Sequence, residues 1–307
     1  MRILIAGGTG VIGRRVIPEL VAAGHEVTAV ARSAARVDAV TRLGARPLIV
    51  DLFDAAAVAR AVAGHETVIN LTTRIPPSSR AFLPGAWRET NRIREQVSKN
   101  LADASVAAGV QRMVQESFAP TYPDRGDQWI TENEEIRPAR YNRGVADAER
   151  AAAAFTLAGG TGIVLRFAYF YGAESDFTRT MIAVVRKGFA PTPVRRDAYI
   201  SSIALDDAAS AVVAALQLPS GTYNVCDDEP VTHEESFNTL AALLHVAPPR
   251  FLPPWTSRLL GSIGKTLARS HRISNRKLRT SSKWAPRYPS VREGWAAVLR
   301  ESSASTR

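Results

Sequence analysis

The sequence has a single cysteine, Cys226, among its 307 residues. One cysteine cannot form a disulfide within the chain, and it leaves no cysteine cluster that could hold a metal. The histidines are also few and show no ligand spacing, so we expect no metal site. They stand at positions 25, 65, 233, 245 and 271.

Long apolar runs are missing as well. No stretch approaches the roughly 20 apolar residues of a membrane-spanning helix, and the first strand-like run begins at Arg2, which leaves no room for a signal peptide. We therefore expect a cytoplasmic protein without a membrane partner. The chain has no internal repeats, and its 46% hydrophobic residues suffice for one large domain, or for a domain with a smaller lobe.

Acidic residues are scarce near the C-terminal end. The formal net charge is +10, and the segment from Arg258 to Arg300 holds eleven Lys or Arg residues against one acid, Glu293. This segment therefore carries the whole excess of positive charge. Most of these charges are expected to form a solvated face. Because no motif for base recognition and no group of aromatic side chains for stacking on bases accompanies these charges, we expect no nucleic-acid partner.

A glycine-rich turn is the strongest positive signal in the chain. The strand-like run Arg2–Ala6 passes into GGTGVIG and then into a helical pattern from residue 14. Such glycines allow a tight turn, a close approach to a pyrophosphate and close packing of the helix on the sheet, and the helix N-terminus favours phosphate. The alternative is a glycine-rich turn without a ligand, but the strand–turn–helix context favours a dinucleotide site. We expect its phosphates to lie on Gly7, Thr9, Gly10, Val11, Ile12 and Gly13.

The second strand-like run indicates which dinucleotide binds. It ends at Arg32 and Ser33, without a carboxylate to accept a ribose 2′-hydroxyl, and an Arg at this place suits a 2′-phosphate. We therefore expect NADP(H), although Arg32 could also be a solvated strand-end residue. Asp51 and Leu52 follow the third strand, where an acid can reach the adenine. Asp51 could instead cap a helix, for which Asp54 is the better candidate.

Strand-like and helical patterns alternate along the chain. Regular alternation of this kind predicts an α/β fold with a doubly wound parallel (Rossmann) sheet. The further strands are expected near 46–50, 67–71, 111–115, 162–167 and 222–226, and the helices near 34–43, 54–63, 87–108, 140–158 and 206–217. We assign residues 1–168 and 197–226 to an NADP-binding domain, and 169–196 and 227–307 to a smaller, mostly helical substrate lobe.

Together these features resemble the extended short-chain dehydrogenase/reductase superfamily, which includes NAD(P)-dependent epimerases, dehydratases and carbonyl reductases. The resemblance runs almost from end to end, through VINLTT, GVQRMVQES, YNRGVADAE, LRFAYFYG, YISSIALDDAASAVVAAL, GTYNVCDDEPVTHEE and KWAPRYPSVREGW. It implies that the cofactor also contacts Leu71, Thr72, Phe167, Ala168 and Phe170.

The catalytic residues of the superfamily are retained only in part. In its Tyr-x-x-x-Lys motif, Tyr141 is present but Val145 stands at the lysine position. The Ser pair after the fifth strand falls on Ser117 and Phe118. The Asn of the preceding long helix falls on Arg94, with Asn91 one turn earlier. Of the four usual side chains, only the tyrosine is clearly kept.

This pattern has a consequence for acid–base chemistry. Tyrosine has an ordinary pKa of about 10, and Val145 supplies no charge to lower it. Tyr141 is then a poor base and a usable proton donor, which favours reduction of a carbonyl over oxidation of an alcohol. Tyr141 could also be a packing residue left from an ancestor. Ser117 is a second candidate donor, although its position at a strand end favours a bond to the backbone. We expect the substrate to contact Phe118, Tyr122 and Tyr169.

We therefore predict an NADPH-dependent ketoreductase of specialised metabolism, such as antibiotic biosynthesis, that acts on a bulky polycyclic or aromatic ketone. Two alternatives stay open: a sugar-nucleotide epimerase or dehydratase, and a catalytically silent NADP-binding regulatory protein. The partner is a small molecule, and the protein is a monomer or homodimer. Leu259, Ile263 and Leu267 recur four residues apart and predict one amphipathic helix in a basic lid over residues 255–285.

Overall fold

Seven parallel strands form the centre of the molecule in a computed structural model that describes residues 1–83, 85–191 and 194–304. The strand order is β11-β7-β5-β4-β1-β2-β3, and every neighbouring pair is parallel. The doubly wound sheet expected from the sequence is therefore confirmed. The strands are β1 (Arg2–Ala6), β2 (Glu26–Ala31), β3 (Arg46–Ile49), β4 (Thr67–Asn70), β5 (Arg112–Phe118), β7 (Thr161–Phe167) and β11 (Gly221–Val225).

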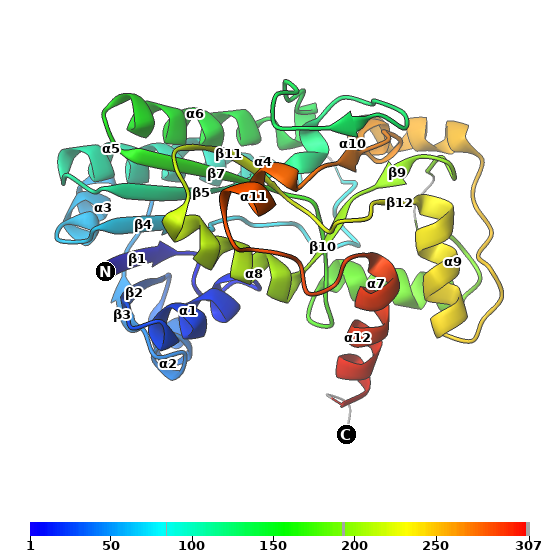
Figure 1. Cartoon of the computed structure of the whole chain (residues 1–307), viewed down its shortest axis with the longest axis horizontal. Coiled ribbons are helices and arrows are strands. Elements are labelled where there is room, and N and C mark those ends of the chain that lie inside the picture. Colours follow the sequence, from blue (N-terminus) through cyan, green and yellow to red (C-terminus); the bar gives the residue numbers. More distant parts are fainter. Residues whose placement is uncertain (84, 192–193, 305–307) are drawn as a thin grey trace.

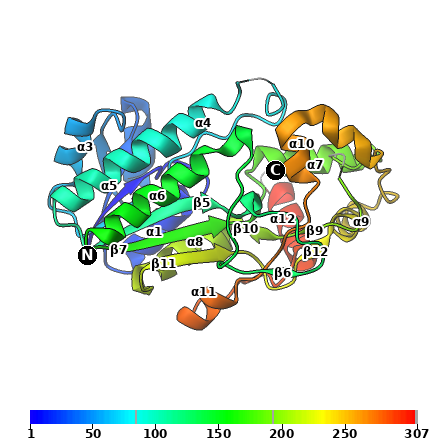
Figure 2. The same cartoon turned by 90° about the horizontal axis from the view of Figure 1, so that it is seen from above.

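Helices cover both faces of this sheet (Figure 1, Figure 2). One face carries α1 (Gly13–Ala22), α2 (Val37–Arg42) and α8 (Leu205–Ala214), with the short 3₁₀ turns Ala34–Arg36 and Ala215–Gln217. The other face carries α3 (Ala55–Val62), α6 (Gly144–Leu157) and a long helix made of α4 (Arg88–Arg92), a π-helical turn (Ile93–Val97) and α5 (Ser98–Ala107).

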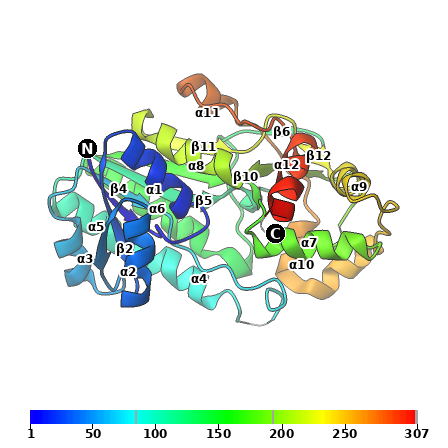
Figure 3. The same ribbon diagram turned by 90° about the horizontal axis from the view of Figure 1, so that it is seen from below.

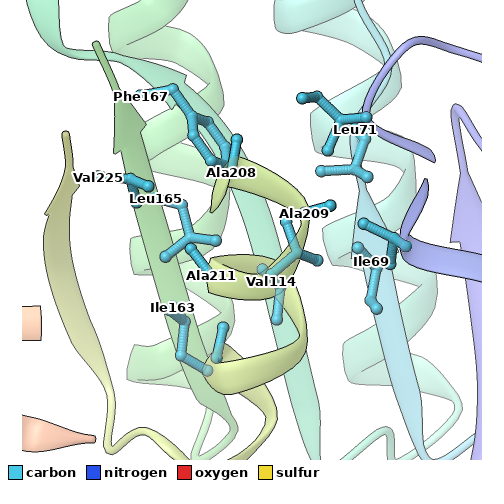
Figure 4. Packing of buried hydrophobic residues seen from close by; sticks show 14 of the residues in the cluster. Ile69, Leu71, Val114, Ile163, Leu165, Phe167, Ala208, Ala209, Ala211 and Val225 are labelled. Carbon is cyan, nitrogen blue, oxygen red and sulfur yellow. The ribbon is translucent and has the colours of Figure 1, made fainter. Parts of the chain in front are cut away.

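Alternation along each strand builds the two layers of the core. In β1, Ile3 and Ile5 join the apolar cluster beneath α1 and α8, whereas Leu4 belongs to the cluster beneath α3 and α5. Figure 4 shows the first cluster, in which Phe167 and its strand neighbours pack on small residues of α8. These small side chains let the helix approach the sheet closely. The labelled members are Ile69, Leu71, Val114, Ile163, Leu165, Phe167, Ala208, Ala209, Ala211 and Val225.

A smaller lobe lies beyond the carboxyl ends of the strands (Figure 1, Figure 3). It has its own apolar cluster, which includes Tyr171, Phe237 and Trp295. The elements of the lobe are β8 (Tyr169–Tyr171), α7 (Asp176–Arg186), β9 (Tyr199–Ile200), β10 (Ser202–Ala204), β12 (Val231–Thr232), α9 (His233–Leu243) and α12 (Val291–Ala304). The expected domain bounds differ from this arrangement, because β9 and β10, expected in the cofactor domain, lie with this lobe, and Ile273 of the expected lobe is buried in the cluster beneath α8.

The expected single amphipathic helix through Leu259, Ile263 and Leu267 is wrong. The segment is a 3₁₀ turn (Pro254–Leu260) followed by α10 (Gly261–Leu267), and Gly261 at the junction has a φ of 59° and a ψ of −136°. Because this conformation suits only glycine, the first turn cannot continue into α10. Leu259 consequently stays 76% exposed instead of sharing an apolar face with Leu267.

The second half of the expected lid is part of the core. After α10 the chain forms β13 (Arg272–Ile273), which pairs with β6 (Trp129–Ile130), and then α11 (Arg276–Ser281). Ile273, Leu278 and Trp284 are buried in the cluster beneath α8. This packing confines any mobile lid to the segment before β13. The remaining short elements are the 3₁₀ turns Ala119–Thr121 and Arg140–Asn142.

Candidate active site

The glycine-rich turn closes tightly against the end of β4. Gly7 has a φ of 87°, and a Cβ atom added to it would lie 2.6 Å from the Leu71 carbonyl oxygen. A Cβ on Gly13 would lie 2.4 Å from the Gly7 oxygen, and the Gly10 N–H donates to that same oxygen at 3.0 Å. The loop therefore has room for backbone alone, which leaves its N–H groups free to approach a ligand.

These N–H groups fit a pyrophosphate. Within the described residues, the N–H groups of Val11, Ile12 and Gly13 have no hydrogen-bond acceptor. They precede or begin α1, and its first turn holds no acidic residue. Unpaired donors at a helix N-terminus are the chemistry that binds phosphate. Thr9 is half-buried beside them. The residues present thus fit a dinucleotide.

The residues expected at the other end of the cofactor lie at the ends of β2 and β3. Arg32 and Ser33 are both exposed directly after β2. Asp51 is exposed, and its Oδ1 accepts the Phe53 N–H at 2.9 Å, while Leu52 is buried. The helix-capping alternative for Asp51 is resolved, because Asp54 accepts the Ala56 and Ala57 N–H groups at 2.9 and 3.1 Å and caps α3.

The end of β4 is held by a buried amide. Asn70 Oδ1 accepts from the Thr72 N–H at 3.1 Å and from its hydroxyl at 2.5 Å, and Asn70 Nδ2 donates to Gln115 at 2.9 Å. Leu71 between them is buried against the glycine turn. Leu71 and Thr72 therefore form a rigid wall beside the phosphate loop.

Tyr141 is fixed in the 3₁₀ turn (Arg140–Asn142) before α6. Asn91 of α4 donates to the Tyr141 carbonyl oxygen at 2.8 Å and accepts the Gly144 N–H at 2.8 Å. The Tyr141 ring meets the edge of Trp87, with ring centres 4.9 Å apart. Val145, one turn along, is fully buried. No cation therefore reaches Tyr141 from its own helix at this position.

The Tyr141 hydroxyl stays protonated at neutral pH. Burial raises the pKa of Tyr141 to about 12, against the smaller opposing effects of the Thr266 side chain and of the charges on Arg94 and Arg269. Thr266 belongs to α10, which contacts the 3₁₀ turn that carries Tyr141. A neutral phenol of this kind can donate a proton and is a poor base.

Ser117 belongs to a buried network. Its hydroxyl donates to Glu149 at 2.5 Å, and Arg166 of β7 binds the same carboxylate through Nε at 2.8 Å and Nη2 at 2.7 Å. Arg166 Nη1 also donates to the Tyr122 hydroxyl at 2.7 Å, which in turn donates to Asn224 at 2.8 Å. The Ser117 hydroxyl is thus engaged, and Tyr122 is fully buried; we leave both out of the proposed site.

Aromatic side chains line the carboxyl ends of β5 and β7. Phe118 meets Tyr169 edge to face, with ring centres 5.7 Å apart, and Phe170 lies next to Tyr169 in the chain. These three residues keep some exposed surface, whereas Phe167 and Ala168 are fully buried. Phe118, Tyr169 and Phe170 are therefore accessible at this end of the sheet, and Phe170, which was expected at the cofactor, packs on Phe167 with ring centres 5.3 Å apart.

Three residues that influence Tyr141, and the ion-pair partner of one of them, were not recognised as functional candidates from the sequence. Glu116 and Arg94 form a buried ion pair, and Thr266 and Arg269 come from the end of α10 and the turn after it. Arg94 had been noticed only as the occupant of an Asn position. A buried acid in a strand is a weak signal by itself, because its partner is invisible without the fold.

Two further kinds of site are absent from the part of the chain that the structure describes. In residues 1–83, 85–191 and 194–304, no three His, Cys, Asp or Glu side chains gather as a metal would require. None of the described helices is long and apolar enough to cross a membrane. A cavity of about 490 Å³ opens at the amino ends of β1 to β3, beside Arg2, His25, Arg46 and His65, far along the sheet from Tyr141.

Comparison with known proteins agrees with this geometry. A family described as NAD(P)H-binding matches residues 7–219. The chain is 33% identical over 308 residues to a Streptomyces 3-diazoavenalumate denitrifying reductase, covering 96% of this chain and 99% of the relative. A 3-beta-hydroxysteroid dehydrogenase of Mycolicibacterium neoaurum is 31% identical over 114 residues, which are 37% of this chain and 31% of that one.

Solved structures share the fold. Thermus thermophilus UDP-glucose 4-epimerase with NAD superposes with a TM-score of 0.79 at 22% identity, covering 99% of this chain and 100% of that chain. Human epimerase family protein SDR39U1 with NADPH gives a TM-score of 0.80 at 20% identity, covering 98% and 99%.

Proposed function

The chain belongs to the NAD(P)H-binding family of oxidoreductases with the extended short-chain dehydrogenase/reductase fold, and we propose that it is an NADPH-dependent ketoreductase. Its substrate is a bulky, conjugated aromatic or polycyclic ketone of specialised metabolism. When bound, NADPH supplies a hydride. The chain's own residues hold the cofactor phosphates, orient a flat substrate and supply a proton.

A neutral Tyr141 beside Val145 is the observation that carries the proposal. The pKa of Tyr141 is raised to about 12 by burial, and Val145 offers no ammonium group to lower it. Reduction needs a proton donor at the carbonyl oxygen, and a neutral phenol can supply that proton. Oxidation of an alcohol needs a base, and a neutral phenol is a poor one. A sugar epimerase must first oxidise its substrate and then reduce it, so this site suits an epimerase less well than a reductase.

The NADPH preference rests on Arg32. This side chain is exposed at the end of β2, where an Arg can bind a 2′-phosphate. The basic charge of the C-terminal segment contributes little to this contact, because many of its members bind the protein itself. Arg292 pairs with Glu229 and Glu235, for example, and Arg279 pairs with Asp228.

The flat-substrate preference rests on Phe118, Tyr169 and Phe170. Aromatic rings beside the reacting carbon favour a planar apolar substrate over a sugar. Hydroxyl groups beside the carbonyl of such a substrate would hydrogen-bond the developing alkoxide and so make the ketone easier to reduce at this site.

A second candidate follows from the diazo reductase that matches this chain along its length. In this chain the corresponding acceptor would be an aromatic diazonium, whose ring carbon would gain the hydride while the C–N bond breaks and N₂ leaves. The cation and the hydride together give a neutral arene, so this reaction needs no proton from Tyr141. A site in which Tyr141 lacks a partner lysine therefore suits a diazonium as well as a ketone.

One experiment tests both candidates. The purified protein receives NADPH deuterated at the transferable position, together with aromatic ketones or with ortho-quinone diazides, and the products are analysed by mass spectrometry and NMR. Deuterium on a carbinol carbon supports the ketoreductase, whereas deuterium on a ring carbon with release of N₂ supports the diazo reductase. NADPH that binds but is never oxidised overturns both and favours the silent regulatory protein.

A further inference from the structure

A buried ion pair lies close to Tyr141. Arg94 Nη2 binds Glu116 Oε1 at 2.7 Å, and the two side chains are only 3% and 9% exposed. Yet Arg94 Nε and Glu116 Oε2 have no hydrogen-bond partner among the described residues. A buried pair with unsatisfied atoms stabilises a fold poorly, because the desolvation of both charges is only partly offset. Structural stabilisation alone therefore does not explain this pair.

The backbone at Arg94 is itself unusual. Arg94 lies in the π-helical turn Ile93–Val97, which interrupts an otherwise regular long helix. Such turns are rare and are frequently found at functional sites. One turn earlier, Asn91 binds both the Tyr141 carbonyl oxygen and the Gly144 N–H. The helix that carries Arg94 is thus fixed directly to the turn that carries Tyr141.

A second cation comes from the C-terminal segment. Arg269 Nη1 donates to the carbonyl oxygens of Tyr122 and Arg137 at 2.9 and 3.1 Å, which fixes the guanidinium after α10. The helix that ends just before Arg269, α10, contacts the 3₁₀ turn that carries Tyr141. Arg269 is therefore fixed directly after the helix that packs on this turn.

We propose that Arg94 and Arg269 take the place of the missing lysine, as the positioned cations that stabilise the Tyr141 oxygen once its proton has gone to the substrate. The inference deepens the ketoreductase proposal and depends on it. In the step, the carbonyl carbon gains the hydride and the C=O π electrons move to oxygen. That oxygen takes the proton of Tyr141, which becomes a phenolate until solvent returns a proton.

The charges around Tyr141 agree with this role. Arg94 and Arg269 both act to lower the pKa of Tyr141, while the Glu116 carboxylate bound to Arg94 partly offsets the charge of that arginine. Tyr169 is the other titratable group close by, and burial raises its pKa well above the ordinary value. Tyr169 is therefore neutral at neutral pH, and a phenolate at Tyr141 would meet the charges of Arg94, with its Glu116 partner, and of Arg269.

The test measures ionisation at position 141 without a substrate. We would incorporate 3,5-difluorotyrosine at position 141, since its more acidic phenol titrates in the range where the protein is folded, and follow it by fluorine NMR. The double variant Arg94→Met/Glu116→Gln removes both charges and leaves no buried ion alone. Its midpoint should rise by about one pH unit, a tenfold change in the ionisation constant. Arg269→Met should shift the midpoint in the same direction.

The single variant Glu116→Gln separates electrostatics from damage to the fold. It leaves the Arg94 charge unopposed, so the titration midpoint at position 141 should fall or stay unchanged. Arg94→Lys keeps a positive charge, so its midpoint should stay close to that of the wild-type protein. Lys99→Met is the matched control, because Lys99 is an exposed cation of the same long helix that pairs with Asp103, and it should shift nothing. A rise in Glu116→Gln equal to that in the double variant, or no rise in the double variant, overturns the inference.

The ketoreductase proposal can fail separately. If the wild-type protein reduces no ketone, that proposal fails whatever the titration shows. If ketone reduction occurs but removal of Arg94 and of Arg269 leaves both the midpoint and kcat unchanged, only the present inference fails.

Discussion

The amide of Asn91 binds Tyr141 through the backbone and not through the phenol. Its Nδ2 donates to the Tyr141 carbonyl oxygen and its Oδ1 accepts from the Gly144 N–H, both at 2.8 Å. A Cβ added to Gly144 would lie 2.9 Å from the Asn91 backbone, so the two segments are in close contact. Asn91 thereby fixes the start of α6 and leaves the Tyr141 hydroxyl available for chemistry.

Replacement of Asn91 should therefore cost both stability and rate. Asn91→Ala leaves a buried carbonyl and a buried N–H unpaired, which costs about 1–3 kcal/mol of unfolding free energy for such groups. Urea unfolding measures this loss, and kcat should fall while NADPH affinity is kept. Gln96→Ala, on the exposed side of the same helix, is the control. Equal stability of Asn91→Ala and wild type would contradict the assigned role.

Arg32 should set the choice of cofactor. We expect NADPH to bind at least about tenfold more tightly than NADH, because a charge-assisted contact to phosphate is worth about 1.5–3 kcal/mol. Arg32→Asp should reduce or reverse that preference in calorimetric titrations, and Arg60→Asp on the exposed face of α3 should not. Equal affinity of the wild-type protein for both nucleotides would rule the contact out.

Tyr141→Phe should lower ketone reduction by no more than about a hundredfold, the low end of general acid catalysis. Because the pKa of Tyr141 is raised to about 12, the donor is fully protonated at all pH values well below that. The rate should therefore show no rise from neutral to moderately alkaline pH. A steep alkaline rise together with a dead Tyr141→Phe variant would show that a phenolate base is required.

The segment from the 3₁₀ turn Pro254–Leu260 to the end of α10 should move when substrate binds. In the structure, α10 contacts the 3₁₀ turn that carries Tyr141, so a substrate bound at the proton donor should contact this segment and restrict its motion. Hydrogen exchange should show these peptides gaining protection on addition of substrate to the NADP complex. The peptide of α11 serves as the internal control, since Leu278 is buried in the core. Equal protection of α10 with and without substrate would make it a fixed element.

Two buried histidines should make the protein sensitive to acid. Burial lowers the pKa of His233 to about 3 and that of His271 to about 4, from 6.5. Between these values and 6.5 the folded protein binds fewer protons than the unfolded chain, so the stability from neutral imidazoles is complete above pH 6.5 and is lost as pH falls. By about pH 4.5 the loss reaches roughly 2–3 kcal/mol for each histidine.

Urea unfolding at a series of pH values measures this slope. His271→Gln should flatten it, while His245→Asn, at an exposed position with a φ of 57°, should not, because Asn tolerates that conformation. A pH-independent stability from pH 6.5 down to about 4 would contradict the burial of neutral imidazoles.

Most of the fold could be predicted from the sequence because its signals are local. Apolar runs and the glycine motif place β1 and α1 within a residue or two of their observed ends. The capping role of Asp54 was also predicted and is confirmed. This was possible because an N-cap side chain accepts from N–H groups only two or three residues further along the chain. The π-helical turn at Arg94 was not predicted, because its sequence still has helical periodicity.

The predicted lid helix failed for a similar reason. Periodicity counted Leu259 and Leu267 on one face, but Gly261 adopts a positive φ and breaks the helix between them. The partner of Ser117 could not be found either. Glu149 lies on α6 and Arg166 on β7, and only the packing of these elements brings the three side chains together.

By itself, the sequence determined that the chain binds a dinucleotide, and that Tyr141 has Val145 where a lysine would stand, because both features are contained in a few consecutive residues. Only the tertiary structure decided which groups surround the Tyr141 hydroxyl. Arg94, Thr266 and Arg269 come from distant segments, and the electrostatics of a buried phenol depend on which charges the fold brings near it and on how much water it excludes.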